Sequence, residues 1–183
     1  NMKKIHIHDK EFRLFIPSAR IQRAVLKMAR QLNKDLKGKD VIFLGVLNGC
    51  YMFIADLSRH LTIPCQISFV KLASYTASST TGEVYDLIGI NEDLSNRTVV
   101  ILEDIIDTGI TIEHILSAVQ SYHPAEVRIA TLFFKKEACK PGFRPDYVGI
   151  EIPAHFIVGY GLDYNRFGRN YPDVYIESES KKR

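Results

Sequence analysis

The sequence predicts an α/β fold in which helices flank a doubly wound, mainly parallel sheet. Two observations lead to this prediction. Apolar runs such as VIFLGVL (41–47) and TVVIL (98–102) are continuous, as in strands that are buried on both faces. Stretches with helical periodicity lie between such runs, and strands that alternate with helices are typical of a parallel sheet.

The first helix is expected to begin at Ser18, a candidate N-cap residue, and to end before Gly38. Apolar residues recur in it at every third or fourth position, which places them on one helical face. These residues are Ile21, Val25, Met28, Leu32 and Leu36. The segment is therefore predicted to be an amphipathic helix that covers the sheet.

The later elements continue the alternation of helix and strand. Besides the strand at 98–102, they are expected to be a helix over 51–60, a strand over 63–75, a helix over 111–122 and strands over 128–134 and 147–152. The stretch SYTASSTTGEV (74–84) is polar and lacks any core pattern. A polar loop of this length is typical of a lid over a binding site or of a disordered surface segment.

Composition narrows the class of protein. The 183 residues, of which 46% are hydrophobic and 25% charged, fit a single soluble domain. A net charge of +3 is too small to indicate a nucleic-acid partner, and no apolar run reaches the ~20 residues that span a membrane. Three widely spaced cysteines predict free thiols and hence a cytoplasmic protein.

The stretch VVILEDIIDTGIT (99–111) places three carboxylates, Glu103, Asp104 and Asp107, beside an apolar strand. A simple surface turn accounts for one acid but not for three. An Asp-Thr-Gly sequence after two apolar residues also occurs in aspartic proteases, but that fold is all-β and needs two such aspartates. The protease interpretation also fits poorly with the amphipathic helix that the Asp-Thr-Gly sequence opens here.

A ligand-binding interpretation fits better, because ligands of open α/β sheets bind beyond the carboxyl ends of the strands. The loop 107–111 would present backbone N–H groups and hydroxyls at a helix N-terminus, which suits a phosphate monoester. Glu103 and Asp104 would accept hydrogen bonds from a diol and attract Mg²⁺. A 5-phosphorylated ribose supplies all three features together.

The EDIIDTG sequence resembles the phosphoribosyl-pyrophosphate motif of the type I phosphoribosyltransferases, in the form typical of their hypoxanthine-guanine members. Further motifs follow the family's order from about Val41 to Asn170. The resemblance implies one domain over 1–183, with a core of about 38–150 and a small hood formed by residues 1–16 and 151–183. It also implies a homodimer or homotetramer.

The resemblance implies a role for each part of the acidic stretch. Glu103 and Asp104 would hold the ribose hydroxyls with Mg²⁺ nearby, and Asp107 would act as general base or proton relay beside N7 of the purine. The phosphate cradle would consist of Thr108, Gly109, Ile110 and Thr111.

Two loops are assigned by the same resemblance. Leu47, Asn48 and Gly49 would form the pyrophosphate loop, where the family has a cis peptide before the middle residue. That residue is often a lysine or arginine in the family, whereas it is Asn48 here. Ser74 and Tyr75 would begin a mobile loop that closes over the reacting centre and excludes water.

The base-binding part of the resemblance is PAHFIVGYGLDYNRFGRN, at 153–170. Phe156 would stack on the purine, the Ile157 backbone would bind its edge, and Lys135 would donate to its O6 atom. Asp163 would bind a second Mg²⁺, and Arg169 would bind the pyrophosphate.

The implied reaction transfers a phosphoribosyl group from phosphoribosyl pyrophosphate to a 6-oxopurine, which is hypoxanthine and also guanine. Two alternatives stay open. One is a transferase that prefers xanthine. The other is a nucleotide-sensing regulator that binds nucleic acid, which the base-binding motif and the lack of an evident basic stripe disfavour.

Overall fold

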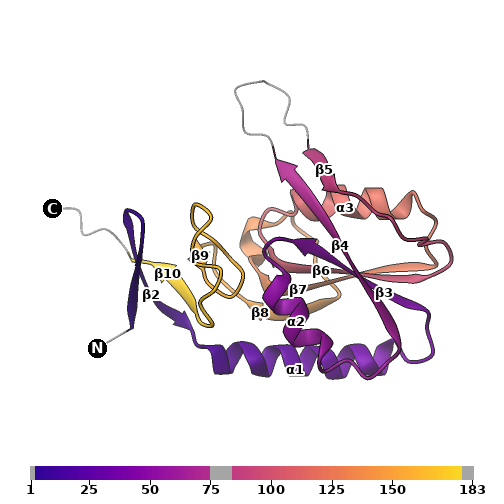
Figure 1. The fold of residues 1–183 in the computed structure, drawn as a ribbon, viewed down its shortest axis with the longest axis horizontal. Helices are drawn as coiled ribbons and strands as arrows, with labels where there is room; N and C mark the ends of the chain where they lie inside the picture. Colours follow the sequence, from indigo (N-terminus) through magenta and orange to yellow (C-terminus); the bar gives the residue numbers. More distant parts are fainter. Residues whose placement is uncertain (1–2, 75–83, 179–183) are drawn as a thin grey trace.

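The computed structural model describes residues 3–74 and 84–178, with backbone only at 73–74 and 84–87. These residues form two sheets (Figure 1). The larger sheet has six strands in the order β5-β4-β3-β6-β7-β8, and the smaller has four in the order β1-β2-β10-β9. No helix in the described ranges is both long and apolar enough to cross a membrane.

The larger sheet confirms the predicted fold class. Five of its strands run parallel, and only β5 pairs antiparallel, at the edge beside β4. The strands are β3 (Val41–Leu47), β4 (Cys65–Ser74), β5 (Val84–Ile88), β6 (Thr98–Ile106), β7 (Glu126–Phe134) and β8 (Tyr147–Glu151). Strand β5 was not expected, because its sequence lacks the long apolar run that marks the central strands.

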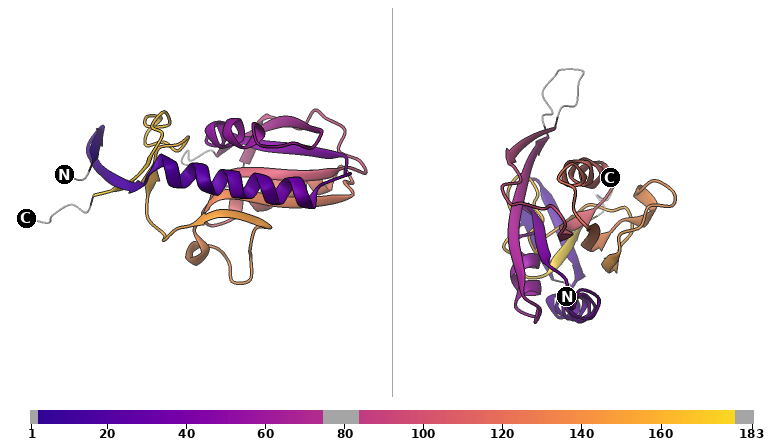
Figure 2. Two further views of the ribbon diagram at one scale, coloured as in Figure 1. Left: turned by 90° about the horizontal axis from the view of Figure 1, so that it is seen from below. Right: turned by 90° about the vertical axis from the view of Figure 1, so that its right-hand side faces the viewer.

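Helices cover both faces of this sheet (Figure 2). The helices α1 (Ser18–Asp35) and α2 (Tyr51–Ser58) pack on one face, and α3 (Ile110–Gln120) packs on the other. Successive residues of the central strands enter different cores: Phe43 packs with α1 and α2, whereas Leu44 packs with α3. This burial on both sides explains the continuous apolar runs. A short 3-10 helix, η1 (Lys136–Ala138), follows β7.

The smaller, antiparallel sheet combines segments from both ends of the sequence. It contains β1 (Lys4–Ile7), β2 (Lys10–Ile16), β9 (Ile157–Val158) and β10 (Val174–Glu177). It corresponds to the hood that the resemblance implied. In Figure 1 it lies beside the larger sheet, and α1 runs from it along the whole core.

The start of α1 corrects one detail of the sequence interpretation. The N-cap is Pro17, which has no side-chain acceptor, and Ser18 is already helical. The Ser18 N–H instead donates to Asp173 at 2.8 Å, and Lys3 pairs with the same carboxylate at 2.8 Å. These contacts hold the pKa of Asp173 below its ordinary value. A carboxylate distant in sequence therefore caps α1 and ties it to the hood.

The outer face of α1 corrects a second expectation, the lack of a basic stripe. Five exposed basic residues follow one another at intervals of three or four positions along the helix, and together they are named the α1 stripe. Its members are Arg20, Arg23, Lys27, Arg30 and Lys34. The stripe was missed because the small net charge of the whole chain concealed a local excess of cations.

Candidate active site at the carboxyl end of β6

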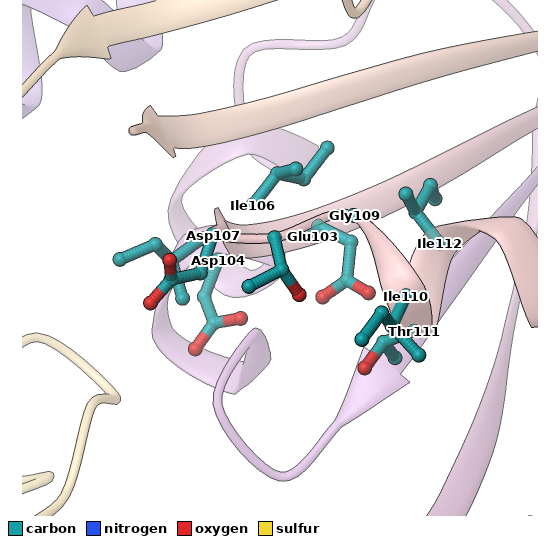
Figure 3. Close-up of a pocket in the computed structure, with 10 residues that line it drawn as sticks. Glu103, Asp104, Ile106, Asp107, Gly109, Ile110, Thr111 and Ile112 are labelled. Carbon is teal, nitrogen blue, oxygen red and sulfur yellow. The ribbon is translucent and has the colours of Figure 1, made fainter. Parts of the chain in front are cut away.

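A hollow of about 260 Å³ opens at the carboxyl end of β6 (Figure 3). Its lining is one continuous segment, residues 103–112, and is named the β6 hollow. Strand β6 extends to Ile106, beyond the expected end at 102, so Glu103 and Asp104 belong to the strand itself. The hollow lies where the topology of the sheet places ligand sites.

The turn from β6 into α3 leaves hydrogen-bond donors facing the hollow. Gly109 is the N-cap residue of α3 at φ +89°, a left-handed conformation that favours glycine, and no side chain caps the helix there. The first N–H groups of α3 therefore have no side-chain acceptor. Thr108 and Thr111 are exposed beside them. This arrangement suits an anion with several oxygens.

The two adjacent acids of β6 are buried, with 5% of Glu103 and 9% of Asp104 exposed. Burial raises the pKa of Asp104 to about 6. Burial, followed by the charge of Asp104, raises the pKa of Glu103 well above its ordinary value. Within the described ranges no ion pair links either acid to a cation, so the site favours a positively charged or hydroxyl-bearing ligand.

Asp107 and Lys135 form a close ion pair, with 2.9 Å between Oδ2 and Nζ. Lys135 is 7% exposed and its backbone N–H donates to the Ile106 carbonyl, so the lysine is held at the end of β7. The Cys139 thiol donates to the Asp107 carbonyl at 2.6 Å. Neighbouring Lys136 is exposed. Lys135 is therefore not a solvated surface charge, and its contact with Asp107 was not foreseen.

The loop after β3 reaches the same acids. The Leu47–Asn48 peptide is cis, as the resemblance implied. Gly49 packs so closely on Asp104 that a Cβ would lie 1.9 Å from Oδ2. On its other side, a Cβ on Gly161 would lie 2.1 Å from the Gly49 carbonyl oxygen. The loop is thus enclosed between β6 and the segment after β9.

The segment after β9 holds two of the expected residues against each other. Arg169 approaches Asp163 at 3.2 Å and donates to the Gly161 carbonyl at 2.7 Å. The other carboxylate oxygen of Asp163 accepts the Arg166 N–H at 2.7 Å. Arg169, expected to bind pyrophosphate, and Asp163, expected to bind magnesium, are therefore paired with each other in this structure.

Phe156 projects from the hood with 43% of its surface exposed. Tyr164 meets its ring edge-on at a centroid distance of 5.8 Å, and Phe12 lies 6.2 Å away. The Lys10 ammonium lies 5.8 Å from the Phe156 ring and 5.1 Å from the Tyr164 ring. Asp9 accepts the Tyr164 hydroxyl at 2.7 Å. These supporting residues were missed, although the alternation in KEFRLFI is a signal that Phe12 faces inward.

Of the other residues expected in the site, the structure describes the positions of some but not of all. Ile157 is buried in β9 and pairs with Ile176 of β10. Asn48 is exposed. Ser74 ends β4 and its side chain is not described, and Tyr75 lies outside the described residues, as does most of the expected lid. Within the described ranges no hydrogen bond or ring contact joins Phe156 to the lining of the β6 hollow.

Comparisons with known proteins give one consistent result. Residues 17–165 match the phosphoribosyl transferase domain family. The chain is 39% identical to the hypoxanthine-guanine phosphoribosyltransferase of Homo sapiens, over 93% of this chain and 83% of that protein. Identity to the Rattus norvegicus enzyme of the same name is 40%, with the same coverage of both chains.

Solved structures show the same similarity. A hypoxanthine phosphoribosyltransferase from Staphylococcus aureus superposes with a TM-score of 0.84 at 34% identity, covering 90% of each chain. A hypoxanthine-guanine phosphoribosyltransferase from Bacillus anthracis, solved with a HEPES molecule in its active site, gives 0.83 at 34% identity, covering 89% of this chain and 96% of that one.

Proposed function

The chain belongs to the phosphoribosyl transferase domain family, and on this premise we propose that it transfers a 5-phosphoribosyl group at the β6 hollow. It is a purine salvage enzyme, in which the group passes from phosphoribosyl pyrophosphate to hypoxanthine or guanine and pyrophosphate leaves. One observation carries the location of the site: two buried acids that form no ion pair among the described residues lead directly into an uncapped helix start.

The sugar phosphate binds along the segment 103–111. Backbone N–H groups of the first turn of α3 and the hydroxyls of Thr108 and Thr111 receive the 5-phosphate, with Gly109 and Ile110 completing the cradle. Glu103 and Asp104 accept hydrogen bonds from the ribose 2′- and 3′-hydroxyls. The exposure of the threonines and the absence of a side-chain cap support this assignment.

The acids also fit magnesium, because Mg²⁺ takes carboxylate oxygens together with substrate phosphates and water. No group of three or more His, Cys, Asp or Glu in the described part of the chain forms a complete metal cage, so substrate oxygens would supply the remaining ligands. Glu103 and Asp104 would hold one ion and Asp163 a second. Bound magnesium neutralises charge on the leaving pyrophosphate.

The purine edge is complementary to the pair of Asp107 and Lys135. A 6-oxopurine presents an N7–H donor beside an O6 acceptor. Asp107 accepts the N7 proton as general base, and Lys135 donates to O6. The two residues directly follow the adjacent strands β6 and β7, and their separation of 2.9 Å supports a role as one acceptor–donor unit. Adenine carries an amino donor where Lys135 also donates, so it is rejected.

The hood completes the site around the base and the leaving group. Phe156 stacks on the purine, the Ile157 backbone binds its edge, and Lys10 and Tyr164 support the stacking ring. The Asn48–Gly49 loop and Arg169 bind pyrophosphate. For this, Arg169 exchanges its contact with Asp163 for the phosphate oxygens, which also frees Asp163 for metal.

In the proposed reaction, the protein positions the reactants and accepts a proton, and takes little covalent part itself. The anomeric carbon passes through an oxocarbenium-like state, as in glycosyl transfer generally. The residues position sugar and base, exclude water and accept one proton. The three free cysteines support a cytoplasmic location, and a homodimer or homotetramer is the proposed assembly.

Initial rates with phosphoribosyl pyrophosphate, Mg²⁺ and four purines test the proposal. We expect hypoxanthine and guanine to react, and adenine to react ~10⁴–10⁵-fold less efficiently because a donor faces a donor. Efficient use of adenine would contradict the assignment of Lys135. A preference for xanthine over both expected purines would instead favour the alternative specificity.

A further inference from the structure

The α1 stripe is a straight line of cations. Its members occupy positions 20, 23, 27, 30 and 34, and steps of three or four residues keep them on one helical face. At 1.5 Å of rise per residue the line is ~21 Å long. All five side chains are exposed.

The stripe lacks the acidic partners that surface helices ordinarily carry. No hydrogen bond or ion pair within the described residues involves any of its five cations. The only acid of α1, Asp35, accepts a hydrogen bond from the Tyr147 hydroxyl at 2.9 Å. Several cations elsewhere are paired, as Lys4 is with Glu11 and Lys140 with Glu113. The positive charge of the stripe is therefore uncompensated.

A groove of about 580 Å³ runs beside the stripe, between α1 and the edge strand β8. Arg20, Arg23 and Lys27 form one of its rims, and Ala24 and Ile150 give it an apolar floor. Glu151, at the opposite rim, is paired with Arg144 at 2.7 Å. A positive rim above an uncharged floor suits a narrow, negatively charged chain.

We propose that the α1 stripe and its groove bind the phosphate backbone of single-stranded nucleic acid. At the 3.4 Å per phosphate of one strand in a duplex, a lower bound for a more extended single strand, the stripe faces at most about six phosphates. No aromatic side chain lines the described groove, so bases have no stacking platform and binding is independent of sequence. The proposal does not depend on the transferase reaction.

A membrane surface fits this geometry less well. The apolar residues of α1, among them Ile21, Val25 and Leu32, are buried in the protein core and have nothing to offer a bilayer. Interfacial helices depend on an exposed apolar face in addition to their charge. The cations also form one line, whereas a lipid surface offers charge over a plane.

Fluorescence anisotropy with a labelled oligouridylate of about 20 nucleotides tests the proposal, since this probe exceeds the ~6 phosphates that the stripe spans. We expect a dissociation constant of about 10⁻⁴–10⁻⁶ M at physiological salt. Five contacts limit the slope of log K against log salt to about −3.5. An oligocytidylate of the same length should bind equally well.

The decisive variant replaces all five stripe cations by glutamine, which preserves helix propensity. We expect at least a ~10-fold loss of affinity and a nearly flat salt dependence. A second variant, Arg20→Gln with Arg23→Gln and Lys27→Gln, changes only the groove rim and should show part of the same loss. Transfer to hypoxanthine, unchanged in both variants, reports that the fold is intact.

The matched control also removes five positive charges that lie outside the groove lining, at Lys4, Arg13, Lys39, Lys136 and Lys140. It should retain nearly all the affinity of the parent. Equal losses in the stripe and control variants, or no binding at ~50 mM salt, would overturn the proposal. Stripe-dependent binding to phosphatidylserine vesicles in preference to the oligonucleotide would overturn the assignment of the partner.

Discussion

The two halves of the site are built in opposite ways. The phosphoribosyl half is one continuous segment, 103–112, whose acids are buried and form no ion pair among the described residues. The base and pyrophosphate half is assembled from β7 and the hood, and its charges are already paired, as Lys135 with Asp107 and Arg169 with Asp163. The first half gains a partner when ligand binds, whereas the second must exchange one partner for another.

The largest expected effect comes from the acid that joins the halves. Asp107→Asn should lower turnover ~10²–10⁴-fold, the range of a positioned acid–base group. Binding of phosphoribosyl pyrophosphate should change much less, because the backbone donors of α3 remain. Single-turnover rates and donor titrations measure the two quantities. Equal losses in both would show that Asp107 belongs to the donor site rather than to the base site.

The phosphoribosyl half, whose acids form no ion pair among the described residues, predicts a strong effect of ligand on the stability of the protein. Saturation with phosphoribosyl pyrophosphate and Mg²⁺ at 100 times the dissociation constant should add about 2.7 kcal/mol to the free energy of unfolding. Thermal melts with and without both ligands measure this. A melting temperature indifferent to the pair would contradict the assignment of Glu103 and Asp104.

The same acids predict how the stability of the free protein depends on pH. The pKa of Asp104 is raised to about 6 in the folded protein, above its ordinary value of 3.8, so the folded state holds the proton more tightly. Its contribution to stability is full below pH 3.8 and is lost as pH rises to about 6. Asp104→Asn should flatten this part of the curve.

The base and pyrophosphate half predicts different outcomes for substitutions at two neighbouring lysines. Lys135→Met should lower efficiency with hypoxanthine about 10–150-fold, since a hydrogen bond to a charged group contributes roughly 1.5–3 kcal/mol. Lys136→Met should have little effect, because Lys136 is exposed beyond the strand. Steady-state kinetics on both variants separate the roles. Unchanged efficiency in Lys135→Met would remove this residue from the base site.

The smallest expected effect concerns the support of Phe156. Tyr164→Leu removes an edge-on aromatic contact, and such pairs contribute about 0.5–1.5 kcal/mol, so the KM for purine should rise several-fold. The KM for phosphoribosyl pyrophosphate should not change. Tyr164→Phe retains the ring without the bond to Asp9 and should stay near the parent. A loss confined to turnover would indicate another role for Tyr164.

The sequence predicted the two halves unequally. The β6 hollow was foreseen from the residues alone, because a strand end, three acids and a helix start are adjacent in the sequence. Phe156, Asp163 and Arg169 were assigned only through the resemblance, since their contacts depend on hood strands too short to show periodicity. No local pattern indicates that Asp173 caps α1, that Cys139 donates to Asp107 or that the Lys10 ammonium lies near two rings. Such contacts between distant segments exist only once the chain has folded.

The cap that Asp173 provides for α1 also has a consequence for the order of folding during synthesis. Strand β2 ends at Ile16, but its neighbour β10 begins only at Val174, one residue after Asp173. Pairing across so much of the chain is slow, because a long loop must close first. The ribosome therefore releases β2 and the start of α1 long before either has its partner. We expect the large sheet to fold first, and the base-binding hood to form only after β10 has left the exit tunnel.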